Sequence, residues 1–322
     1  MSVQLYRHFT ALTKFLRIIR FAFSFIVLCS SFSVAASWET QQLPHFSIYY
    51  QPIDSRIAQA LIKQADTIYR TITEDAGYAP PRKISVYLCP TPECFHQQQP
   101  MTVKLPKWAV GVAYPGLNQI VIRSALTLQE RGYIKPIEIF KHEFAHIVIE
   151  QTLAERGGAP RWLSEGFSMY HARQWTIAGQ RTLEEVTLRN DFIPLAMLTT
   201  AFPSDEKTAR IAYAQSYSVV TFLVNNYEKP IFHKFINNLR KGMDTNTALV
   251  YSAEVNLEDL ELEWQASLKK RYSWIAYLIN IGLFWFALSV GFVIIYLLKR
   301  QKMRRVQKRW EEEETLEFPE TE

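Results

Sequence analysis

Two histidines four residues apart, with a glutamate between them, are the residues of this chain best suited to chemistry. They occur in the segment His142-Glu143-Phe144-Ala145-His146. A helix with 3.6 residues per turn places both imidazoles on one face. Neutral imidazoles at this spacing can both bind Zn²⁺, and Glu143 then lies beside any water on the metal, where it can act as a general base. The alternative interpretation is an exposed helix that contains two histidines and a glutamate by chance.

A third ligand follows at a distance that a pair of helices can bridge. A catalytic zinc takes three protein ligands and keeps one position open. Glu165 follows His146 after eighteen residues, within the segment PRWLSEGFSMY at 160–170. Lys135-Pro136 predicts the start of the first helix and Gly157-Gly158 its end. The second helix would begin near the proline of the later segment, and Glu165 could also be an ordinary acid of its first turn.

The complete pattern resembles a known class of enzymes. HEFAH, eighteen residues and the glutamate of WLSEGFS are similar to the motifs of the gluzincin metallopeptidases, which include thermolysin-like enzymes and the large zinc aminopeptidases. The layout most resembles the small bacterial peptidase MA-like domains. The resemblance implies that His142, His146 and Glu165 bind one Zn²⁺ ion and that Glu143 is the general base. It also implies a thermolysin-like α+β fold and a peptide or protein substrate.

A strand shortly before the first motif could hold the substrate. In the resembling enzymes an edge strand at this place pairs with the extended substrate backbone. Here the residues would be Gly111, Val112 and Ala113, and Gly111 would permit a close backbone approach; a plain core strand is the alternative. The aminopeptidases have a glutamate in this segment that holds the free amine of the substrate. This chain has GVAY instead, so we expect an endopeptidase or another exopeptidase rather than an aminopeptidase.

A tyrosine is the candidate for a second electrophile beside the metal, because the oxyanion that develops during hydrolysis needs one. The segment 211–220, IAYAQSYSVV, resembles the helix that carries a catalytic tyrosine in the aminopeptidases. That resemblance selects Tyr213. Tyr217 lies one turn later on the same face and remains an alternative, as does a structural role for both.

The scaffold is predicted to be a small sheet followed by helices. Alternating polarity predicts strands, a long amphipathic helix interrupts them, and the chain after residue 130 is almost wholly helical. The predicted strands are His45–Gln51, Ile84–Leu88, Trp108–Tyr114 and Gln119–Arg123, and the helix is Ser55–Asp75. The sheet lobe therefore precedes a helical lobe, with the metal-binding helix at their junction, where ligand clefts are common.

Cys89 and Cys94 form a separate pair in LCPTPEC. In an oxidising compartment a short disulfide loop is the expected interpretation. A metal site would require further soft ligands nearby, and His96 is the one candidate, so we expect His96 at the surface. His171 and His233 are expected to be surface or interhelical residues.

The two ends of the chain predict one membrane topology. Residues 1–36 combine basic residues with an apolar run that ends in VAAS, which indicates a signal peptide or an uncleaved N-terminal anchor. An uncharged apolar segment at 273–298 is long enough to span a bilayer. Seven basic residues follow it at 299–309 and should remain in the cytoplasm. The predicted parts are 1–36 signal or anchor, 37–272 extracytoplasmic domain (sheet lobe 37–130, helical lobe 131–272), 273–298 transmembrane helix and 299–322 charged cytoplasmic tail.

Charge limits the class of partner. The formal net charge of the chain is +5, but the charges of segment 37–272 nearly cancel. The basic run beside the span is an orientation signal rather than a nucleic-acid site. The sequence thus predicts a membrane-anchored zinc metallopeptidase, and the resemblance to the bacterial peptidase MA-like domains implies that it is anchored in a bacterial inner membrane and faces the periplasm or exterior. The other hypotheses are a zinc-containing binding module that does not cleave, and a membrane assembly factor.

Overall fold

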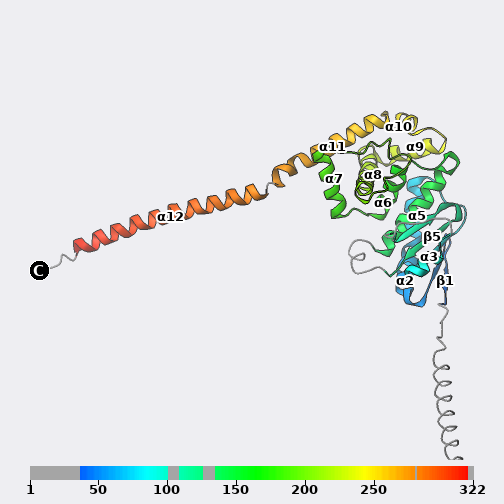
Figure 1. Cartoon of the computed structure of the whole chain (residues 1–322), viewed down its shortest axis with the longest axis horizontal. Helices are drawn as coiled ribbons and strands as arrows, with labels where there is room; N and C mark the ends of the chain where they lie inside the picture. Colours follow the sequence, from blue (N-terminus) through cyan, green and yellow to red (C-terminus); the bar gives the residue numbers. More distant parts are fainter. Residues whose placement is uncertain (1–36, 101–108, 126–134, 280, 318–322) are drawn as a thin grey trace, which may run out of the picture.

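A five-stranded mixed sheet and a group of helices make up the folded part of the chain, and one further helix, α12, extends away from them (Figure 1). The computed structural model describes residues 37–100, 109–125, 135–279 and 281–317. The predicted signal segment 1–36 and Trp108 lie outside the described residues. The predicted class is confirmed: a small sheet lobe precedes a helical lobe in an α+β fold. Proceeding along the chain, the strands are β1 (Glu39–Gln42), β2 (Phe46–Tyr50), β3 (Ile84–Cys89), β4 (Gly111–Tyr114) and β5 (Gln119–Arg123).

The helices follow the same order. The long helix predicted after the first strands is α2, and the two predicted motif helices are α5 and α6. Their bounds are α2 (Ser55–Ala76), α3 (Pro92–Gln97), α5 (Pro136–Leu153), α6 (Arg161–Ala172), α7 (Ile177–Arg189), α8 (Glu206–Asn226), α9 (Glu228–Arg240), α10 (Thr245–Ala253), α11 (Leu257–Ile279) and α12 (Ile281–Glu317), with short 3₁₀ turns η1 (Pro52–Asp54), η2 (Pro115–Leu117) and η3 (Ala154–Arg156).

The sheet order is β1-β2-β3-β5-β4, which places β4 at an edge. Strands β2, β3 and β5 are parallel, while β1 and β4 run antiparallel to their neighbours. The four predicted strands are confirmed within a few residues at their ends. Strand β1 and helix α3 were not predicted. Strand β1 has no buried face, because all four of its residues are exposed, so no alternation in polarity marks it.

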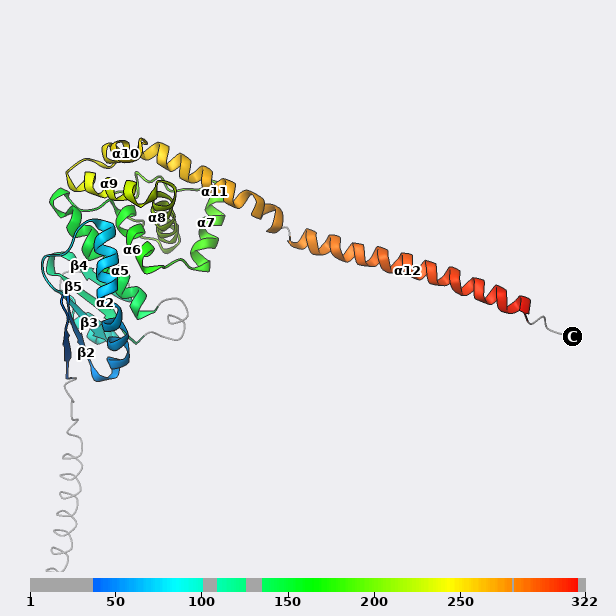
Figure 2. The same cartoon turned by 180° about the vertical axis from the view of Figure 1, so that it is seen from behind.

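Successive residues of β5 contact different layers. Ile120 and Ile122 belong to the main core, whereas Val121 packs with Phe95 of α3 in a second, smaller core. This alternation is the geometry of a strand with both faces covered. Helices α2 and α5 cover the other face, where both contact strands of the sheet (Figure 2). The sheet is therefore a layer between α3 and the helical lobe.

Helix α5 is buried on most of its circumference, which identifies it as the central element of the fold. Phe140, Phe144, Ile147 and Val148 are fully buried, and the helix contacts β4, β5, α2 and α6. A helix that is apolar nearly all round is stable only when other elements enclose it. Its polar residues therefore need a functional or ionic environment of their own.

Helices α6 and α8 approach closely because Gly166 has no side chain. A Cβ atom at Gly166 would lie 2.3 Å from the Ser216 carbonyl oxygen and 2.5 Å from Val220 Cγ2. Both neighbours belong to α8, and a backbone carbonyl cannot move aside easily. The glycine that follows Glu165 thus sets the distance between α6 and α8.

The structure differs from the predicted disulfide, because Cys89 and Cys94 are free thiols. Both lie in the small core beneath α3 and hydrogen-bond to each other. Burial raises the pKa of both thiols. Because the thiolate is the species that attacks during disulfide formation, burial keeps this pair in the less reactive protonated form. His96 is exposed, as predicted.

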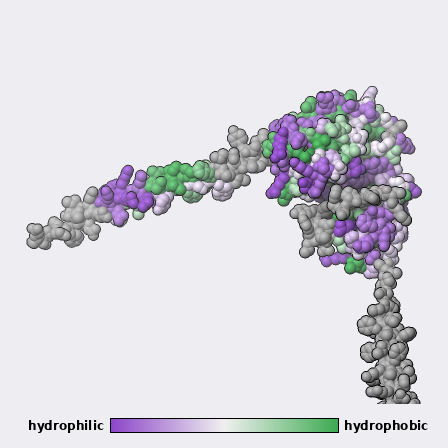
Figure 3. Space-filling model, in the orientation of Figure 1, coloured by the Kyte–Doolittle hydropathy of each residue, from purple (hydrophilic) through white to green (hydrophobic). Residues whose placement is uncertain are grey.

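One helix among the described residues is long and apolar enough to cross a membrane, judged by length and composition. It is the segment Phe284–Trp310 of α12, with 27 residues and a mean hydropathy of 1.3. Large apolar side chains on it are open to solvent, including Phe286 at 67% and Ile295 at 63% exposure. Figure 3 shows this apolar band followed directly by a strongly hydrophilic one.

Candidate metal centre

Helices α5 and α6 bring the three predicted ligands together. The Nε2 atoms of His142 and His146 lie 3.1 Å apart, and Glu165 Oε2 lies 3.7 Å from the first and 3.5 Å from the second. Among the described residues these three form the one group of histidine, cysteine or acidic side chains arranged to hold a metal ion. The four-residue spacing on α5 orients both rings toward α6, and the packing of the two helices supplies the carboxylate.

The three atoms fit a Zn²⁺ ion. Tetrahedral zinc with bonds of about 2.0–2.1 Å separates its ligand atoms by about 3.3 Å. The separations of 3.1, 3.5 and 3.7 Å lie around that value. Two nitrogens and one carboxylate oxygen are also a donor set typical of catalytic zinc, with a fourth position left for water or substrate.

Further side chains hold two of the ligands in place. Ser164 Oγ lies 3.0 Å from His146 Nδ1 and donates a hydrogen bond of 2.6 Å to Glu150 Oε1. Arg161 Nη2 contacts Glu165 Oε1 at 2.7 Å. Because Arg161 occupies one carboxylate oxygen, the other remains directed at the histidines. Such outer contacts fix the orientation and tautomer of metal ligands.

The charges of the ligands are coupled. Burial lowers the pKa of His142 to about 3, and the adjacent His146 contributes in the same direction. Burial would also lower the pKa of His146, but the Glu165 carboxylate outweighs it and raises that pKa. Burial would raise the pKa of Glu165, but His146 and Arg161 outweigh it and hold the pKa at about 2. One imidazole is therefore neutral and the carboxylate ionised at neutral pH, as metal ligation requires.

Glu143 lies beside this group with its carboxyl group enclosed between α5 and β4. It is 8% exposed and accepts a hydrogen bond from the backbone N–H of Ala113. Burial raises its pKa from 4.5 to about 7, and the Glu165 charge adds to the increase, while His146 opposes it. A carboxyl group whose pKa lies near neutrality is suited to take and return a proton.

Gly111 makes room for that carboxyl group. A Cβ atom on Gly111 would lie 2.6 Å from Glu143 Oε1 and 2.4 Å from Ile139 Cγ2. The glycine in the edge strand therefore permits close approach, as expected from the sequence, but it is the Glu143 side chain that comes close.

The backbone of β4 alternates between its partner strand and the open edge. The N–H of Arg123 donates to the Val110 carbonyl, and Gly111 is opposite Ile122. Because hydrogen-bonded and non-hydrogen-bonded pairs alternate in an antiparallel ladder, Val112 bonds to β5. The backbone groups of Gly111 and Ala113 are directed to the open edge, where the Ala113 N–H reaches Glu143. Of the three predicted strand residues, Val112 is thus the one that offers no backbone group at the edge.

Tyr213 lies in the cleft with the metal ligands, whereas Tyr217 does not. Tyr213 is 36% exposed, and burial followed by the Glu165 charge raises its pKa to about 12. Its ring packs edge-on against Phe202 at 5.1 Å, and the Arg161 guanidinium lies 5.9 Å from the centre of the same Phe202 ring. Tyr217 stacks on Trp175 at 4.6 Å and lines other cavities. The structure therefore separates two tyrosines that the sequence left as alternatives.

The three metal-ligand residues, Glu143 and Tyr213 line one cleft of about 980 Å³. The edge of β4 forms one wall of this cleft, and Arg161 also lines the cleft. A cleft of this size can accept an extended chain of several residues. Its contents suit hydrolysis: a metal-ligand group, a carboxyl group that can accept a proton, a hydroxyl that can donate a hydrogen bond, and an open strand edge.

Four residues of the site were not identified from the sequence. Arg161 had a signal, because it lies one helical turn before Glu165, where a cation can pair with an acid. Ser164 and Glu150 had none, since neither type nor spacing distinguishes them from ordinary helix residues. Gln174 lines the cleft and its side chain favours the protonated form of His142. It follows the end of α6, so only the folded chain places it there.

Comparison with known proteins yields one family and several structures. The model of the Peptidase MA superfamily matches residues 63–270. A yeast LTA4 hydrolase in complex with bestatin is similar at 14% identity and a TM-score of 0.39, over 76% of this chain and 38% of that one. An M1 zinc metallopeptidase from Deinococcus radiodurans is similar at 16% identity and a TM-score of 0.43, over 72% of this chain and 51% of that one. The chain thus spans about half or less of their length. No curated protein matches the sequence.

Proposed function

Because the chain belongs to the Peptidase MA superfamily, we propose that it is a membrane-anchored, zinc-dependent peptidase of the gluzincin type. One observation carries the proposal: the ligand atoms of His142, His146 and Glu165 lie within 4.8 Å of one another, and the buried carboxyl group of Glu143 lies in the same cleft. A ligand group without Glu143 would indicate a structural metal. The combination indicates hydrolysis.

Each side chain then has a role that its surroundings support. His142, His146 and Glu165 would hold a Zn²⁺ ion, which would supply Lewis-acid chemistry toward the scissile carbonyl and water. Glu143 takes a proton from the attacking water and returns it to the leaving amine. Tyr213 donates a hydrogen bond to the developing oxyanion; its raised pKa keeps the hydroxyl protonated at neutral pH. Ser164 and Arg161 hold His146 and Glu165 in orientation.

The substrate proposal rests on the edge of β4. An extended peptide would add to this edge as a further strand, through the N–H and carbonyl groups of Gly111 and the carbonyl group of Ala113, because the Ala113 N–H already donates to Glu143. The cleft is open along the strand, and among its described lining residues no carboxylate comes from β4. We therefore propose that the chain is a peptidase but not an aminopeptidase. Endopeptidase activity is the first activity to test.

Replacing Gly111 by alanine should reduce hydrolysis by about tenfold or more while zinc remains bound. The added methyl group would meet Glu143 Oε1 at 2.6 Å, and displacing a catalytic group by even 1 Å has large effects on rate. Gly116→Ala is the matched control, because a Cβ atom there meets nothing within 4 Å. Steady-state rates and zinc content of both variants are the measurement. Equal activity of the two variants would show that Glu143 is not held against β4.

Tyr213→Phe should lower kcat by about a hundredfold and leave KM nearly unchanged, because the hydroxyl would act on the oxyanion, which exists only during reaction. Tyr217→Phe is the control, since Tyr217 lies outside the metal cleft. Kinetics of both variants on the same peptide decide the assignment. A larger effect from Tyr217 would reverse it.

We also propose that α12 anchors the chain in a bacterial inner membrane, with the catalytic part on the periplasmic or outer side. Two observations support this: the exposed apolar side chains in the first part of Phe284–Trp310, and the seven basic residues at 299–309 near its C-terminal end. The full chain should resist extraction by alkaline carbonate. A protease added outside intact spheroplasts should remove the folded domain and leave the C-terminal tail protected. Digestion of the tail instead would reverse the proposed orientation.

Two other functions compete with catalysis: a zinc-containing module that binds peptides without cleaving them, and a membrane assembly factor. Metal analysis of the detergent-solubilised full chain, together with cleavage of an unbiased peptide library, separates them. Stoichiometric zinc with turnover supports the peptidase. Zinc without turnover favours the binding module, and absence of zinc favours the assembly factor.

A further inference from the structure

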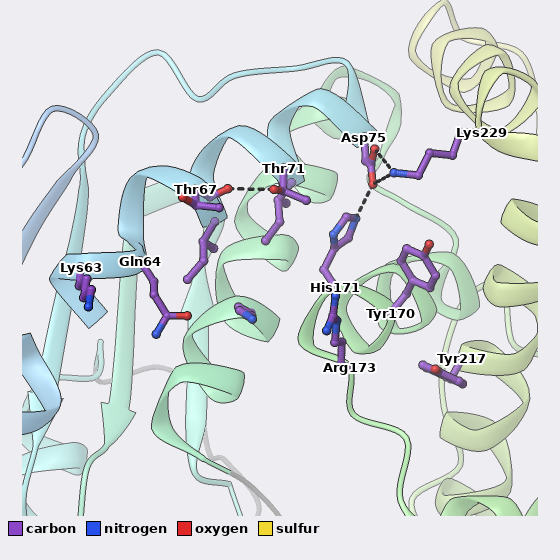
Figure 4. A pocket seen from close by; sticks show the side chains of 13 residues that line it. Lys63, Gln64, Thr67, Thr71, Asp75, Tyr170, His171, Arg173, Tyr217 and Lys229 are labelled. Atoms are coloured by element: carbon purple, nitrogen blue, oxygen red, sulfur yellow. Dashed lines mark hydrogen bonds and ion pairs between the residues drawn. The ribbon is translucent and has the colours of Figure 1, made fainter. Parts of the chain in front are cut away.

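A second cleft lies among α2, α5, α6, α8 and α9 and shares no lining residue with the metal cleft. Its volume is about 550 Å³, which suits a small organic ligand. Helix α2 provides one wall through Lys63, Thr67, Thr71 and Asp75, which recur every four residues and so share one face of the helix. Figure 4 shows Asp75 next to His171 and close to Tyr170, with Thr71, Thr67 and Lys63 successively farther along α2. We call this cavity the α2–α6 cleft.

Positive charge dominates the α2–α6 cleft. Four cationic side chains line it, and its one carboxylate is Asp75. Lys229 already contacts both oxygens of Asp75, at 3.1 and 3.2 Å. Among the described residues no carboxylate forms an ion pair with Lys63, Lys141 or Arg173. Three cations thus line one cavity without a neutralising carboxylate, which favours a multivalent anion as the occupant.

A buried polar group on the wall also lacks a hydrogen-bond partner. The His171 side chain is 4% exposed, and its Nε2 atom lies 3.7 Å from Asp75 Oδ2, too far for a hydrogen bond. The ring is held against Phe167, with centroids 4.4 Å apart. Buried polar atoms are nearly always hydrogen-bonded in folded proteins, so this nitrogen marks a place where a ligand or its water shell would complete the site.

The other polar groups of the cleft include hydrogen-bond donors. Lys63, Lys141 and Arg173 present ammonium and guanidinium groups, and Tyr170 and Tyr217 present hydroxyls. Lys141 and Lys229 are close enough to His171 for their charges to lower its pKa, with burial as the main cause. Cations and hydroxyls surrounding one cavity are typical of sites for phosphate, whose oxygens accept several charge-assisted hydrogen bonds at once. A carboxylate would satisfy fewer of them.

We propose that the α2–α6 cleft binds a phosphorylated organic ligand, with Lys63, Lys141 and Arg173 as the lining cations that balance its negative charge. The cavity is larger than an inorganic phosphate requires, so the phosphate belongs to a larger molecule. That molecule is a soluble phosphorylated compound or the headgroup of an anionic lipid, and the chemistry recognised in the cleft is the same for both.

Calorimetry with pyrophosphate on the full chain, in a neutral detergent at low salt, tests the soluble source. Native mass spectrometry of the same sample with added phosphatidylglycerol or phosphatidylcholine tests the lipid source. Lys63→Gln combined with Arg173→Asn should weaken binding by about tenfold or more, because both changes remove a positive charge that would face the anion. Asparagine is chosen because Arg173 has a φ of 55°, a conformation that Asn tolerates.

The control variant also loses two positive charges, but at positions outside the α2–α6 cleft. Lys83→Gln combined with Arg181→Gln alters two exposed cations outside the α2–α6 cleft, and binding should remain within about twofold of the unaltered chain. If the first pair of changes prevents folding, Lys63→Gln alone carries the test, because Lys63 lies on an exposed part of α2. Phosphate binding in the α2–α6 cleft should persist in Glu143→Gln. The binding assay therefore tests this proposal independently of whether the chain hydrolyses peptides.

Cleft-dependent binding of pyrophosphate supports a soluble phosphate ligand, and cleft-dependent retention of phosphatidylglycerol but not phosphatidylcholine supports a lipid headgroup. Equal weakening by the control pair would show general attraction of anions and overturn the proposal. Absence of binding for both probes would overturn it as well.

Discussion

Glu143→Gln is expected to leave zinc bound and to reduce peptide hydrolysis by about a thousandfold. Glu143 is not one of the three grouped ligands, so the metal site should persist. Glutamine keeps the shape of the side chain and its contact with the Ala113 N–H, but it cannot take a proton from water. General acid–base groups contribute about 10²–10⁴ in rate. Steady-state kinetics and metal analysis of the same preparation are the measurement.

The control for this variant is Glu155→Gln, an exposed acid in the turn after α5, which should keep full activity. Hydrolysis at the rate of the unaltered chain by Glu143→Gln would contradict the mechanism. Loss of zinc together with activity would instead assign Glu143 to the metal site.

The pH dependence of the unaltered enzyme should report the same group. Glu143 acts as a base only when ionised, so kcat/KM should fall as pH decreases through its pKa. Burial raises that pKa from 4.5 to about 7, and the charge of a bound cation favours the carboxylate and lowers it again. We therefore expect the acid limb of the profile between these two values. Tyr213, with its pKa raised to about 12, should not limit activity on the alkaline side below pH 10.

Removal of zinc by a chelator is the change with the second largest expected effect. Hydrolysis should stop and return when Zn²⁺ is added. A ligand present at a thousand times its Kd stabilises the folded state by about 4 kcal/mol. For a domain of this size each kcal/mol shifts Tm by about 2–4 °C, so chelation should lower Tm by roughly 8–16 °C. Thermal unfolding of the detergent-solubilised chain, with and without chelator, measures the shift.

Glu165→Ala provides the comparison. It removes one ligand, and the partner that it leaves, Arg161, is 46% exposed and can be solvated. This variant should fold but show little change of Tm with added zinc. Because His146 must lose its proton to bind metal and its pKa is raised, the zinc-dependent shift of the unaltered chain should shrink below neutral pH. If chelator leaves the Tm of the unaltered chain unchanged, or if the zinc-dependent shift persists at low pH and in Glu165→Ala, this metal site is excluded.

Much of the scaffold was predictable because local patterns are strong where elements are half-buried. Strand β3 and helix α2 alternate between apolar and polar residues with the period of their geometry, and the structure has both close to the predicted bounds. Strand β1 was missed because it is exposed on both faces. The cysteines were assigned from compartment and spacing, whereas their reactivity depends on burial beneath α3, which no local pattern reports.

The grouping of the candidate metal ligands was predictable for a related reason. His142, Glu143 and His146 lie within two turns of one helix, so their relative positions follow from helical geometry alone. Glu165 required only that the next helix pack against the first. Tyr213 and Tyr217 could not be distinguished in the same way, because they share a helix face and differ in their aromatic neighbours, Phe202 for the first and Trp175 for the second.

The sequence by itself determined which residues could bind zinc and activate water, since residue type and spacing along a helix set both. It also determined the apolar segment of α12. The tertiary structure decided the environment of those residues. The contact of β4 with α5 encloses Glu143 and raises its pKa, and the close packing allowed by Gly166 sets the distance between α6 and α8, the helix that carries Tyr213. It also gathered the cations of the α2–α6 cleft from separate elements. Burial, electrostatic coupling and cavities depend on residues distant in the chain, and they exist only once the chain has folded.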